Sequence, residues 1–202
     1  MKQVNLIKLE PWRYRYSHGG VLRNFRNGRG TRALSTKSPL HLVFKSNRIA
    51  LRGTFRSPRQ FRLIHQLLRK YSRHFCVKVE QVSIQGDHLH LLIRTGRRSL
   101  YKNFFRVMAG QIAQVFEREG LLVRATKVTD TPKSLGGRGF TVLRKIRLWK
   151  YRPFTRIVKG RRAHRTIRDY IQLNEKEARG EIPYKKDRLK GLTARERQAL
   201  WD

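Results

Sequence analysis

The stretch 77–94 constrains the fold of this chain more than any other part of its sequence. It reads VKVEQVSIQGDHLHLLIR, with apolar and polar residues largely alternating on either side of Gly86 and Asp87. Alternation is the pattern of a half-buried β-strand, and Gly-Asp is a strong signal for a hairpin turn. The alternation slips in phase between Val79 and Val82, which indicates a β-bulge. The sequence therefore predicts two antiparallel strands joined by a tight turn.

An amphipathic helix is expected on each side of this hairpin. The first follows Ser57, which suits the N-cap, and has Pro58 at its first position. Its apolar residues recur at helical spacing as far as Phe75, and those of the second helix recur over 99–119. Each helix therefore has one apolar face to bury.

The remaining elements suggest how these parts combine. A short apolar strand is expected at 39–46, and a third helix over about 163–179 with Gly180 as its C-cap residue. Strand-like runs also occur within 121–165, so the order is strand, helix, strand, strand, helix, strand, helix. That order predicts an α+β fold, a ferredoxin-like split βαβ sandwich with additions. The fourth strand is not placed by the sequence.

The charge balance indicates a polyanionic partner. The chain has 48 Lys and Arg against 13 Asp and Glu, a formal net charge of +35, so it repels itself. Nucleic acid is the partner that this balance favours, and an anionic membrane surface is the alternative. No apolar run approaches the roughly 20 residues that a membrane-spanning helix needs.

The basic residues extend beyond the predicted sandwich at both ends. We interpret 1–38 as a basic arm, 39–180 as the folded domain with a basic insertion at 121–160, and 181–202 as a charged tail. Side chains of the arm and the insertion are expected to contact phosphates or stack on unpaired bases. The expected phosphate contacts are Arg13, Arg15, Arg23, Arg26, Arg144, Lys145, Arg147, Lys150 and Arg152, and the candidate stacking residues are Trp12, Trp149 and Tyr151.

Cysteine usage suggests a reducing compartment. The single cysteine, Cys76, allows neither an internal disulfide nor a thiolate metal cluster, and we expect it to be a small core residue. The first residues lack the cleavage pattern of a signal peptide. We therefore expect an intracellular, cytoplasmic protein that associates with the nucleoid.

Two histidines stand on the same side of the second hairpin strand. Because side chains alternate along a strand, His88 and His90 point one way while Leu89, Leu91 and Ile93 point the other. Two such imidazoles can converge on one metal ion, and oxygen ligands would then favour Mg²⁺ or Mn²⁺. The alternative is a pair of hydrogen-bonded, half-buried histidines with no metal.

The last predicted helix carries a second polar pair on its apolar stripe. Asn174 occupies a core-type position, where an amide must find a partner, and Tyr170 lies one turn before it on the same side. The alternative is a core tyrosine beside a satisfied asparagine. Together with His88 and His90, however, the pair suggests catalysis. The histidines and the Asn174 carbonyl would hold a divalent cation, and the Tyr170 hydroxyl would attack phosphorus.

These residues resemble those of a known family. The motifs GDHLHLLI and YIQLN look like those of the single-tyrosine HUH transposases, most closely the REP-associated tyrosine transposases, and HLVFKS, YSRHFCVKVEQVSI and RPFTRIV match other parts of that family. The likeness covers about 39–180 and implies a sandwich of the HUH endonuclease type. It implies His88, His90 and Asn174 as metal ligands and Tyr170 as the nucleophile.

The resemblance implies a metal-dependent enzyme that cleaves and rejoins single-stranded DNA through a 5′-phosphotyrosine intermediate and recognises hairpins. Two departures put substrate choice in doubt: Gly86-Asp87 replaces the family's usual Pro-Asn, and Glu175 replaces the proline that often follows the ligand asparagine. The alternative is a domesticated, non-catalytic protein that binds structured DNA or RNA on the same scaffold. Relatives include dimers and members that act alone, so a monomer and a homodimer are both open.

Overall fold

A five-stranded antiparallel sheet forms the centre of the protein. The structure, a computed structural model, describes residues 15–25, 31–123, 125–130 and 140–201. All neighbouring strands of the sheet run antiparallel. Its strands, in spatial order, are β1 (Ser17–His18), β7 (Phe154–Ile157), β2 (Leu40–Lys45), β4 (His88–Arg94) and β3 (Lys78–Ile84).

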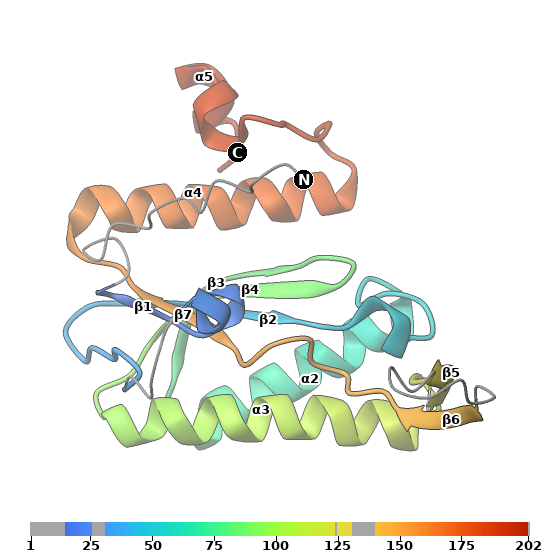
Figure 1. Cartoon of the computed structure of the whole chain (residues 1–202). Coiled ribbons are helices and arrows are strands. Elements are labelled where there is room, and N and C mark those ends of the chain that lie inside the picture. The colour runs from blue at the N-terminus through green and yellow to red at the C-terminus, as the bar shows by residue number, and fades with distance from the viewer. Residues whose placement is uncertain (1–14, 26–30, 124, 131–139, 202) are drawn as a thin grey trace, which may run out of the picture.

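Long helices cover both faces of the sheet. Figure 1 shows two of them beneath the sheet and the third above it. The lower pair is α2 (Pro58–His74) and α3 (Arg98–Arg118), and the upper helix is α4 (Gly160–Arg179). Shorter helices are η1 (Gly20–Phe25), η2 (Arg48–Ala50), η3 (Arg188–Gly191) and α5 (Ala194–Gln198).

The order of these elements confirms the predicted fold. The chain runs β2-α2-β3-β4-α3-β7, and these four strands stand in the order β7-β2-β4-β3, which is the split βαβ arrangement. The fourth strand is β7, which pairs with β2 through registers such as His41 with Arg156. Helix α4 is the addition that covers the second face.

Local signals in the sequence agree with the backbone. The register of β3 against β4 shifts between Val79 and Gln81, which is the predicted bulge. Helix α2 has Pro58 in its first turn, although Ser57 makes no capping bond through its side chain. Helix α4 ends at Gly180, whose φ of 76° lies in the left-handed region that glycine adopts without strain.

The main hydrophobic core lies between the sheet and the pair α2 and α3. Alternation along β2 and β4 directs every second residue into it, and the amphipathic faces of the helices cover those residues. Among the largest fully buried side chains there are Phe44, Phe55, Ile64, Leu89, Leu91, Tyr101, Phe104 and Phe116.

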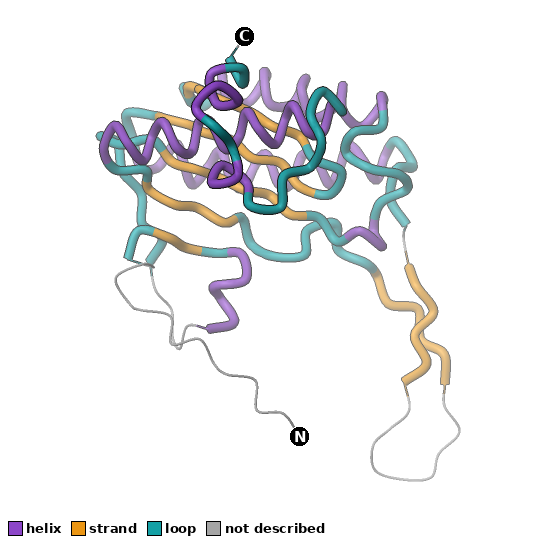
Figure 2. Tube along the Cα trace, turned by 90° about the horizontal axis from the view of Figure 1, so that it is seen from above, coloured by secondary structure: helices purple, strands orange, loops and turns teal. Residues whose placement is uncertain are grey.

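The predicted basic insertion contains a hairpin of its own. β5 (Ala125–Asp130) pairs with β6 (Phe140–Lys145) in a separate two-stranded sheet, which extends away from the body (Figure 2). The chain then returns to the core at Trp149, whose ring packs on Phe44 and Phe55 and whose Nε1 donates to the Ala109 carbonyl. Trp149 is therefore a partly buried residue packed against the core, which favours a structural role over the expected stacking on bases.

Parts of both predicted extensions pack on the domain. In the segment 15–38, Ser17–His18 pair with β7 and Leu34 is buried in the main core. The described tail folds over α4, where the Trp201 indole donates to Asp169 (Figure 1). The boundaries at residues 38 and 181 stay predictions.

Cys76 does not lie in the core. It is exposed, and its φ of 49° belongs to the sharp passage from α2 into β3. Val77 takes the buried position instead. Of the helices in the described ranges, none has the length and hydrophobicity required to cross a membrane.

Candidate active site between the sheet and helix α4

A pair of buried histidines forms the floor of the candidate site. The alternation of β4 directs His90 toward α4, and the neighbouring strand β2 contributes His41 to the same face. His41 Nε2 and His90 Nδ1 are 3.0 Å apart, and the two rings stack with centroids 5.3 Å apart. Spacing along a single strand does not reveal this contact, since it depends on the register between two strands.

The environment of this pair keeps both imidazoles neutral at pH 7. Burial, helped by the charge of Arg156, lowers the pKa of His41 to about 4. Burial also holds the pKa of His90 well below its ordinary value, with further contributions from His41, His88 and Arg188. Neutral imidazole is the form that binds a metal ion.

His90 has one ring nitrogen left for a ligand. Its Nε2 is buried and has no hydrogen-bond partner among the described residues. If His90 donates through Nδ1 to His41 Nε2, the lone pair of its own Nε2 is free. That tautomer is the one required of a metal ligand whose outer nitrogen is oriented by a second group.

His88 is oriented by the residue that precedes it. Its Nδ1 lies 2.6 Å from Asp87 Oδ1, so Nε2 is the nitrogen that remains for a ligand. Burial alone would raise the pKa of the Asp87 carboxyl, but the hydrogen bond with His88 and the charges of Lys45 and Arg48 bring it below its ordinary value. Asp87 thus stays ionised, and it orients the imidazole as carboxylates beside metal-binding histidines do.

Helix α4 places Tyr170 against the histidines. The tyrosine ring meets the His90 ring edge to face, with centroids 5.6 Å apart and planes at 88°, and its centroid is 6.5 Å from that of His41. Tyr170 is half buried, and the small apolar cluster of Leu92, Val158 and Ile171 packs beside it. Asn174, one turn further on, is buried. The structure thus brings together all four residues that the sequence singled out.

An arginine of the tail completes this group, and no motif in the sequence points to it. Arg188 donates to Asn174 Oδ1 and to Glu177 Oε2, the latter at 2.6 Å. Its guanidinium also lies over the Tyr170 ring, 5.4 Å from the centroid. The Asn174 carbonyl therefore already has a cationic partner, while its Nδ2 has none in the described part of the chain.

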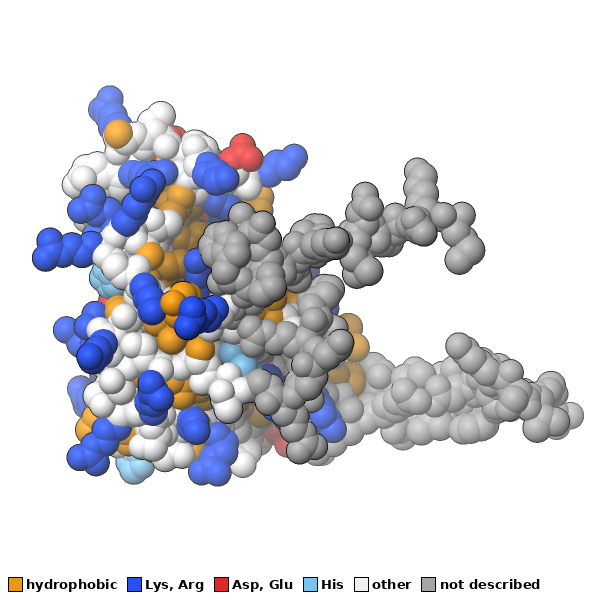
Figure 3. Space-filling view, turned by 60° about the vertical axis from the view of Figure 1, so that its left-hand side comes forward, with side chains coloured by type: hydrophobic (Ala, Val, Ile, Leu, Met, Phe, Trp, Pro, Cys, Tyr) orange, Lys and Arg blue, Asp and Glu red, His pale blue; other side chains and the backbone are white. Residues whose placement is uncertain are grey.

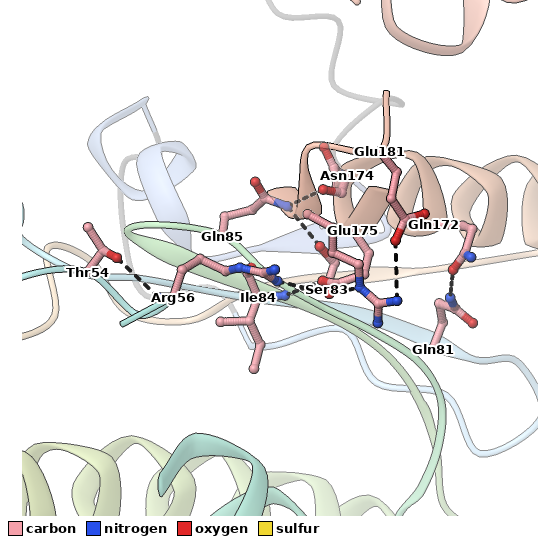
Figure 4. A network of polar contacts seen from close by, with 11 residues as sticks. Thr54, Arg56, Gln81, Ser83, Ile84, Gln85, Gln172, Asn174, Glu175 and Glu181 are labelled. Atoms are coloured by element: carbon pink, nitrogen blue, oxygen red, sulfur yellow. Dashed lines mark hydrogen bonds and ion pairs between the residues drawn. The ribbon is translucent and has the colours of Figure 1, made fainter. Parts of the chain in front are cut away.

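A buried carboxylate fixes α4 to the edge strand of the sheet. Glu175 accepts from the Ile84 backbone N–H at 3.1 Å, from Arg56 at 2.9 Å and from Arg179 at 3.0 Å. These partners come from β3, from the segment before α2 and from α4 itself (Figure 4). Glu175, which replaces the proline common in the resembling family, therefore sets how α4 lies on β3.

Two glutamines add to this attachment. Gln85 donates to the backbone carbonyl of Asn174 at 2.6 Å, and Gln81 donates to Gln172 at 2.6 Å (Figure 4). Buried polar groups are costly unless they are paired, so these bonds disfavour a slip of α4 along the sheet. The position of Tyr170 over His90 follows from that fixed register.

The residues present fit a divalent cation in part. The described ranges hold no cluster of three or more His, Cys, Asp and Glu side chains that is suited to a metal. The set here is instead the free nitrogens of His88 and His90 with the amide oxygen of Asn174. The two imidazoles fit, since the buried Nε2 of His90 lacks a partner. Asn174 joins them only when Arg188 releases its carbonyl.

The expected phosphate contacts are only partly described. Arg15, Arg147, Lys150 and Arg152 are exposed. Arg13, Arg26 and Trp12 lie outside the described residues, as do the side chains of Arg23, Arg144 and Lys145. The assignment of these residues to nucleic acid stays a prediction.

Comparison with known proteins supports the fold. No protein-family model and no curated protein matches the chain. A solved REP-associated tyrosine transposase bound to a REP hairpin aligns with a TM-score of 0.53 and 14% identity over 77% of this chain and 76% of its own. A provisionally assigned transposase from Deinococcus radiodurans R1 aligns at 15% identity over 74% of this chain and 98% of its own, with a TM-score of 0.39 that is too low to indicate a shared fold. This chain has the fold of a REP-associated tyrosine transposase.

Proposed function

We propose that this protein is a single-tyrosine HUH nuclease that cleaves and rejoins single-stranded DNA through a phosphotyrosine on Tyr170. One observation carries the proposal: Tyr170 lies edge-on over His90, in a site that also contains His88 and Asn174. A buried orphan nitrogen on His90 has no structural purpose in a closed core, since an unpaired polar atom there is costly. The shared fold with a tyrosine transposase agrees with this assignment.

The chemistry assigned to the chain is covalent catalysis. The Tyr170 oxygen attacks a backbone phosphorus, a bond forms between them, and the bond to the 3′ oxygen breaks. The 5′ end stays on the protein, the tyrosine proton passes to water at the half-buried ring, and the expelled 3′ oxygen takes a proton from water to become a 3′ hydroxyl. The reverse attack by a 3′ hydroxyl rejoins the strand, so no nucleotide cofactor is needed.

His88, His90 and Asn174 would hold one divalent cation, Mg²⁺ or Mn²⁺. When bound, such an ion polarises the phosphate and stabilises the charge that develops on it. Asp87 keeps His88 turned toward that position, and His41 does the same for His90. Glu175 keeps α4, and with it Tyr170 and Asn174, in register with the histidines.

Hairpin DNA is the substrate that we propose. The solved transposase with this fold is bound to a REP hairpin, and the +35 charge of this chain suits a polyanion. Both extensions and the β5–β6 hairpin are rich in Lys and Arg, which would contact phosphates on either side of the cleaved position.

One contact favours a second candidate, a DNA- or RNA-binding protein that no longer cleaves. Arg188 occupies the carbonyl of Asn174 and covers Tyr170, so the catalytic group is engaged by the chain itself. A domesticated protein would lose nothing by keeping this contact. The two candidates differ in whether the Tyr170 hydroxyl is needed.

A denaturing gel tests the proposal. The protein is mixed with labelled hairpin oligonucleotides that carry single-stranded arms, in Mn²⁺ or Mg²⁺. We expect a denaturant-resistant protein–DNA adduct that is absent with chelator and in Tyr170→Phe and His88→Ala. Tyr184→Phe is the matched control, because Tyr184 is exposed and also lies beside Arg188. Tight binding without an adduct, unchanged in Tyr170→Phe, would establish the binding protein instead.

A further inference from the structure

We propose that a second site, a cationic pocket at the start of α4, binds phosphates of the strand on one side of the cleaved position. The cationic pocket is a cavity of about 510 Å³ whose lining includes Lys37, Arg94, Arg161, His164, Arg165 and Arg168. This inference rests on the proposed function, since it assigns part of the substrate of the same enzyme.

The pocket lies where three segments meet. The residues before β2 form one wall, the end of β4 forms another, and the first turns of α4 form the third. This is the end of the molecule at the left of Figure 1. Figure 3 brings that side forward and shows Lys and Arg spread over it, with few acidic side chains. The cavity therefore lies on a cationic face.

Among the residues that the structure describes, no carboxylate lines the pocket. Glu80 lies beside it and binds Arg94 at 3.0 Å and His164 at 2.8 Å, which accounts for those two groups. Within the described ranges, Lys37, Arg161 and Arg165 have no acidic partner. Such unpaired cations around one cavity repel one another, and an anion would relieve that repulsion.

Arg168 gives an independent sign of a missing ligand. Its guanidinium lies 4.0 Å from the centroid of the Trp201 ring, which holds the side chain in place at the pocket. Its Nε is buried and has no hydrogen-bond partner among the described residues. Arg168 as a whole is half buried and lines the cavity, so its unpaired N–H is a donor to which an anion in the pocket can bind.

The backbone of α4 adds to this attraction. The helix has no acidic residue in its first turn, and its N-cap residue, Lys159, makes no capping bond through its side chain. Its first N–H groups therefore lack the acceptors that a cap supplies, and the helix dipole favours negative charge there. A larger cavity, of about 1000 Å³, includes Glu117 in its lining. A cavity of about 400 Å³ on α2 is lined by Arg62 and Arg69, but it lies along the middle of that helix and has no such helix end.

The distance along α4 between the pocket and Tyr170 indicates which phosphates of the strand the pocket would contact. At about 1.5 Å of rise per residue, Arg165 and Arg161 precede Tyr170 by about 7.5 and 13 Å along α4. One strand of B-form DNA advances about 3.4 Å per nucleotide. A single strand is more extended than a strand of a duplex, so each nucleotide covers at least this distance and the pocket lies at most about four nucleotides from the phosphate that Tyr170 attacks.

A charge-removal variant tests the pocket. Lys37→Gln, Arg161→Gln and Arg165→Gln are combined, since all three side chains are exposed and folding should be kept. Lys70→Gln and Arg73→Gln on α2 with Arg106→Gln on α3 form the matched control, because they remove the same charge from exposed positions on the opposite side of the sheet. Both sets are made in the Tyr170→Phe background, which separates binding from cleavage.

Two readouts are compared. The first is the dependence of oligo-dT affinity on salt, where each phosphate contact on a single strand contributes about 0.7 to the logarithmic slope. We expect the pocket variant to lower the slope by about 2 and the control to leave it nearly unchanged. The second is a scan in which single phosphates of a cleaved hairpin are replaced by neutral methylphosphonates. Replacement at one or more positions within about four nucleotides of the cleaved phosphate should weaken binding in the control but not in the pocket variant.

The proposal that the pocket binds phosphates is contradicted if the salt dependence falls equally in both variants. It is also contradicted if the methylphosphonate scan is the same in both. Failure of the proposed function looks different: the wild type forms no adduct on any hairpin, whatever the slopes are. If the slope falls by about 2 only in the pocket variant and no adduct forms, the pocket is a nucleic-acid site of a binding protein.

Discussion

The two faces of the central sheet are built from the same strands and have opposite characters. Toward α2 and α3, β2 and β4 present Leu40, Leu42, Phe44, Leu89 and Leu91, all within one large buried cluster. Toward α4 they present His41, His88 and His90, and the buried apolar cluster there is only Leu92, Val158 and Ile171. The period of two along a strand is what separates the two sets.

This difference indicates a division of labour. The first face buries enough apolar surface to hold the sandwich together. On the second face, polar contacts of Glu175, Gln85 and Gln81 attach α4, and the site lies among them. Substitutions on the first face should therefore act on stability, and those on the second face on pH dependence, register and chemistry.

The largest expected effect belongs to the first face. Phe104 is fully buried between α3 and the sheet, and Phe104→Ala should cost about 3–5 kcal/mol of unfolding free energy. Ile171→Ala on the second face should cost about 2 kcal/mol, because its apolar surroundings are small. Urea denaturation of both variants measures the difference. Equal costs would contradict the comparison.

The second effect concerns pH. The buried histidines of the second face should make the folded protein less stable in acid. The pKa of His41 is about 4 in the folded protein and 6.5 ordinarily, so only the unfolded chain binds a proton between these values. The free energy of unfolding therefore contains a contribution of about 3 kcal/mol from His41 above pH 6.5, and this contribution is lost as the pH falls toward 4. His41→Gln should flatten the dependence of the thermal midpoint on pH. His74→Gln at an exposed position of α2 should not. His90 keeps part of the dependence in His41→Gln, so the result that counts against this origin is a profile as steep as that of the wild type.

The third effect concerns the attachment of α4. Glu175→Ala removes the acceptor shared by Ile84 N, Arg56 and Arg179 and should cost about 2 kcal/mol, since the two arginines are partly in solvent. It should also lower the yield of the Tyr170 adduct about tenfold, as expected for a misplaced nucleophile. Glu175→Gln keeps one acceptor oxygen and should recover part of the stability and part of the adduct yield. An unchanged adduct yield in a destabilised Glu175→Ala would limit Glu175 to stability.

The smallest effect concerns the competition for Asn174. Arg188→Gln should tighten Mn²⁺ binding a few-fold, about 1 kcal/mol, because it frees the amide carbonyl. Calorimetric titration measures the affinity, with Arg195→Gln as a control from an exposed part of the tail. If both variants bind Mn²⁺ as the wild type does, Asn174 is not among the ligands.

The sequence predicted the order of elements and the two residue pairs of the site because both depend on local periodicity, whereas the resemblance to the HUH transposases implied that the two pairs meet. Alternation fixed the side on which His88 and His90 lie, and helical spacing put Tyr170 and Asn174 on one face of α4. Strand β7 was not placed because it has only four residues, Phe154–Ile157, and its partners are distant in the chain.

The contacts that the sequence did not reveal all depend on how distant segments dock. His41 reaches His90 through the register of β2 on β4, and Arg188 reaches Asn174 through the fold of the tail. In the sequence, Glu175 stands out only as a departure from a family pattern, although in the structure it is buried against β3. Trp149 had an aromatic, basic neighbourhood typical of a base-stacking residue, and packing overrode that signal.

Mass spectrometry of the adduct tests the central claim most directly. After reaction with hairpin DNA and nuclease digestion, trypsin separates Tyr170 in the peptide 169–176 from Tyr184 in the peptide 180–185. We predict a nucleotide joined through phosphate to Tyr170, with peptide 180–185 unmodified. A nucleotide on Tyr184, or on neither peptide when an adduct is seen on the gel, would contradict the assignment of Tyr170 as the nucleophile.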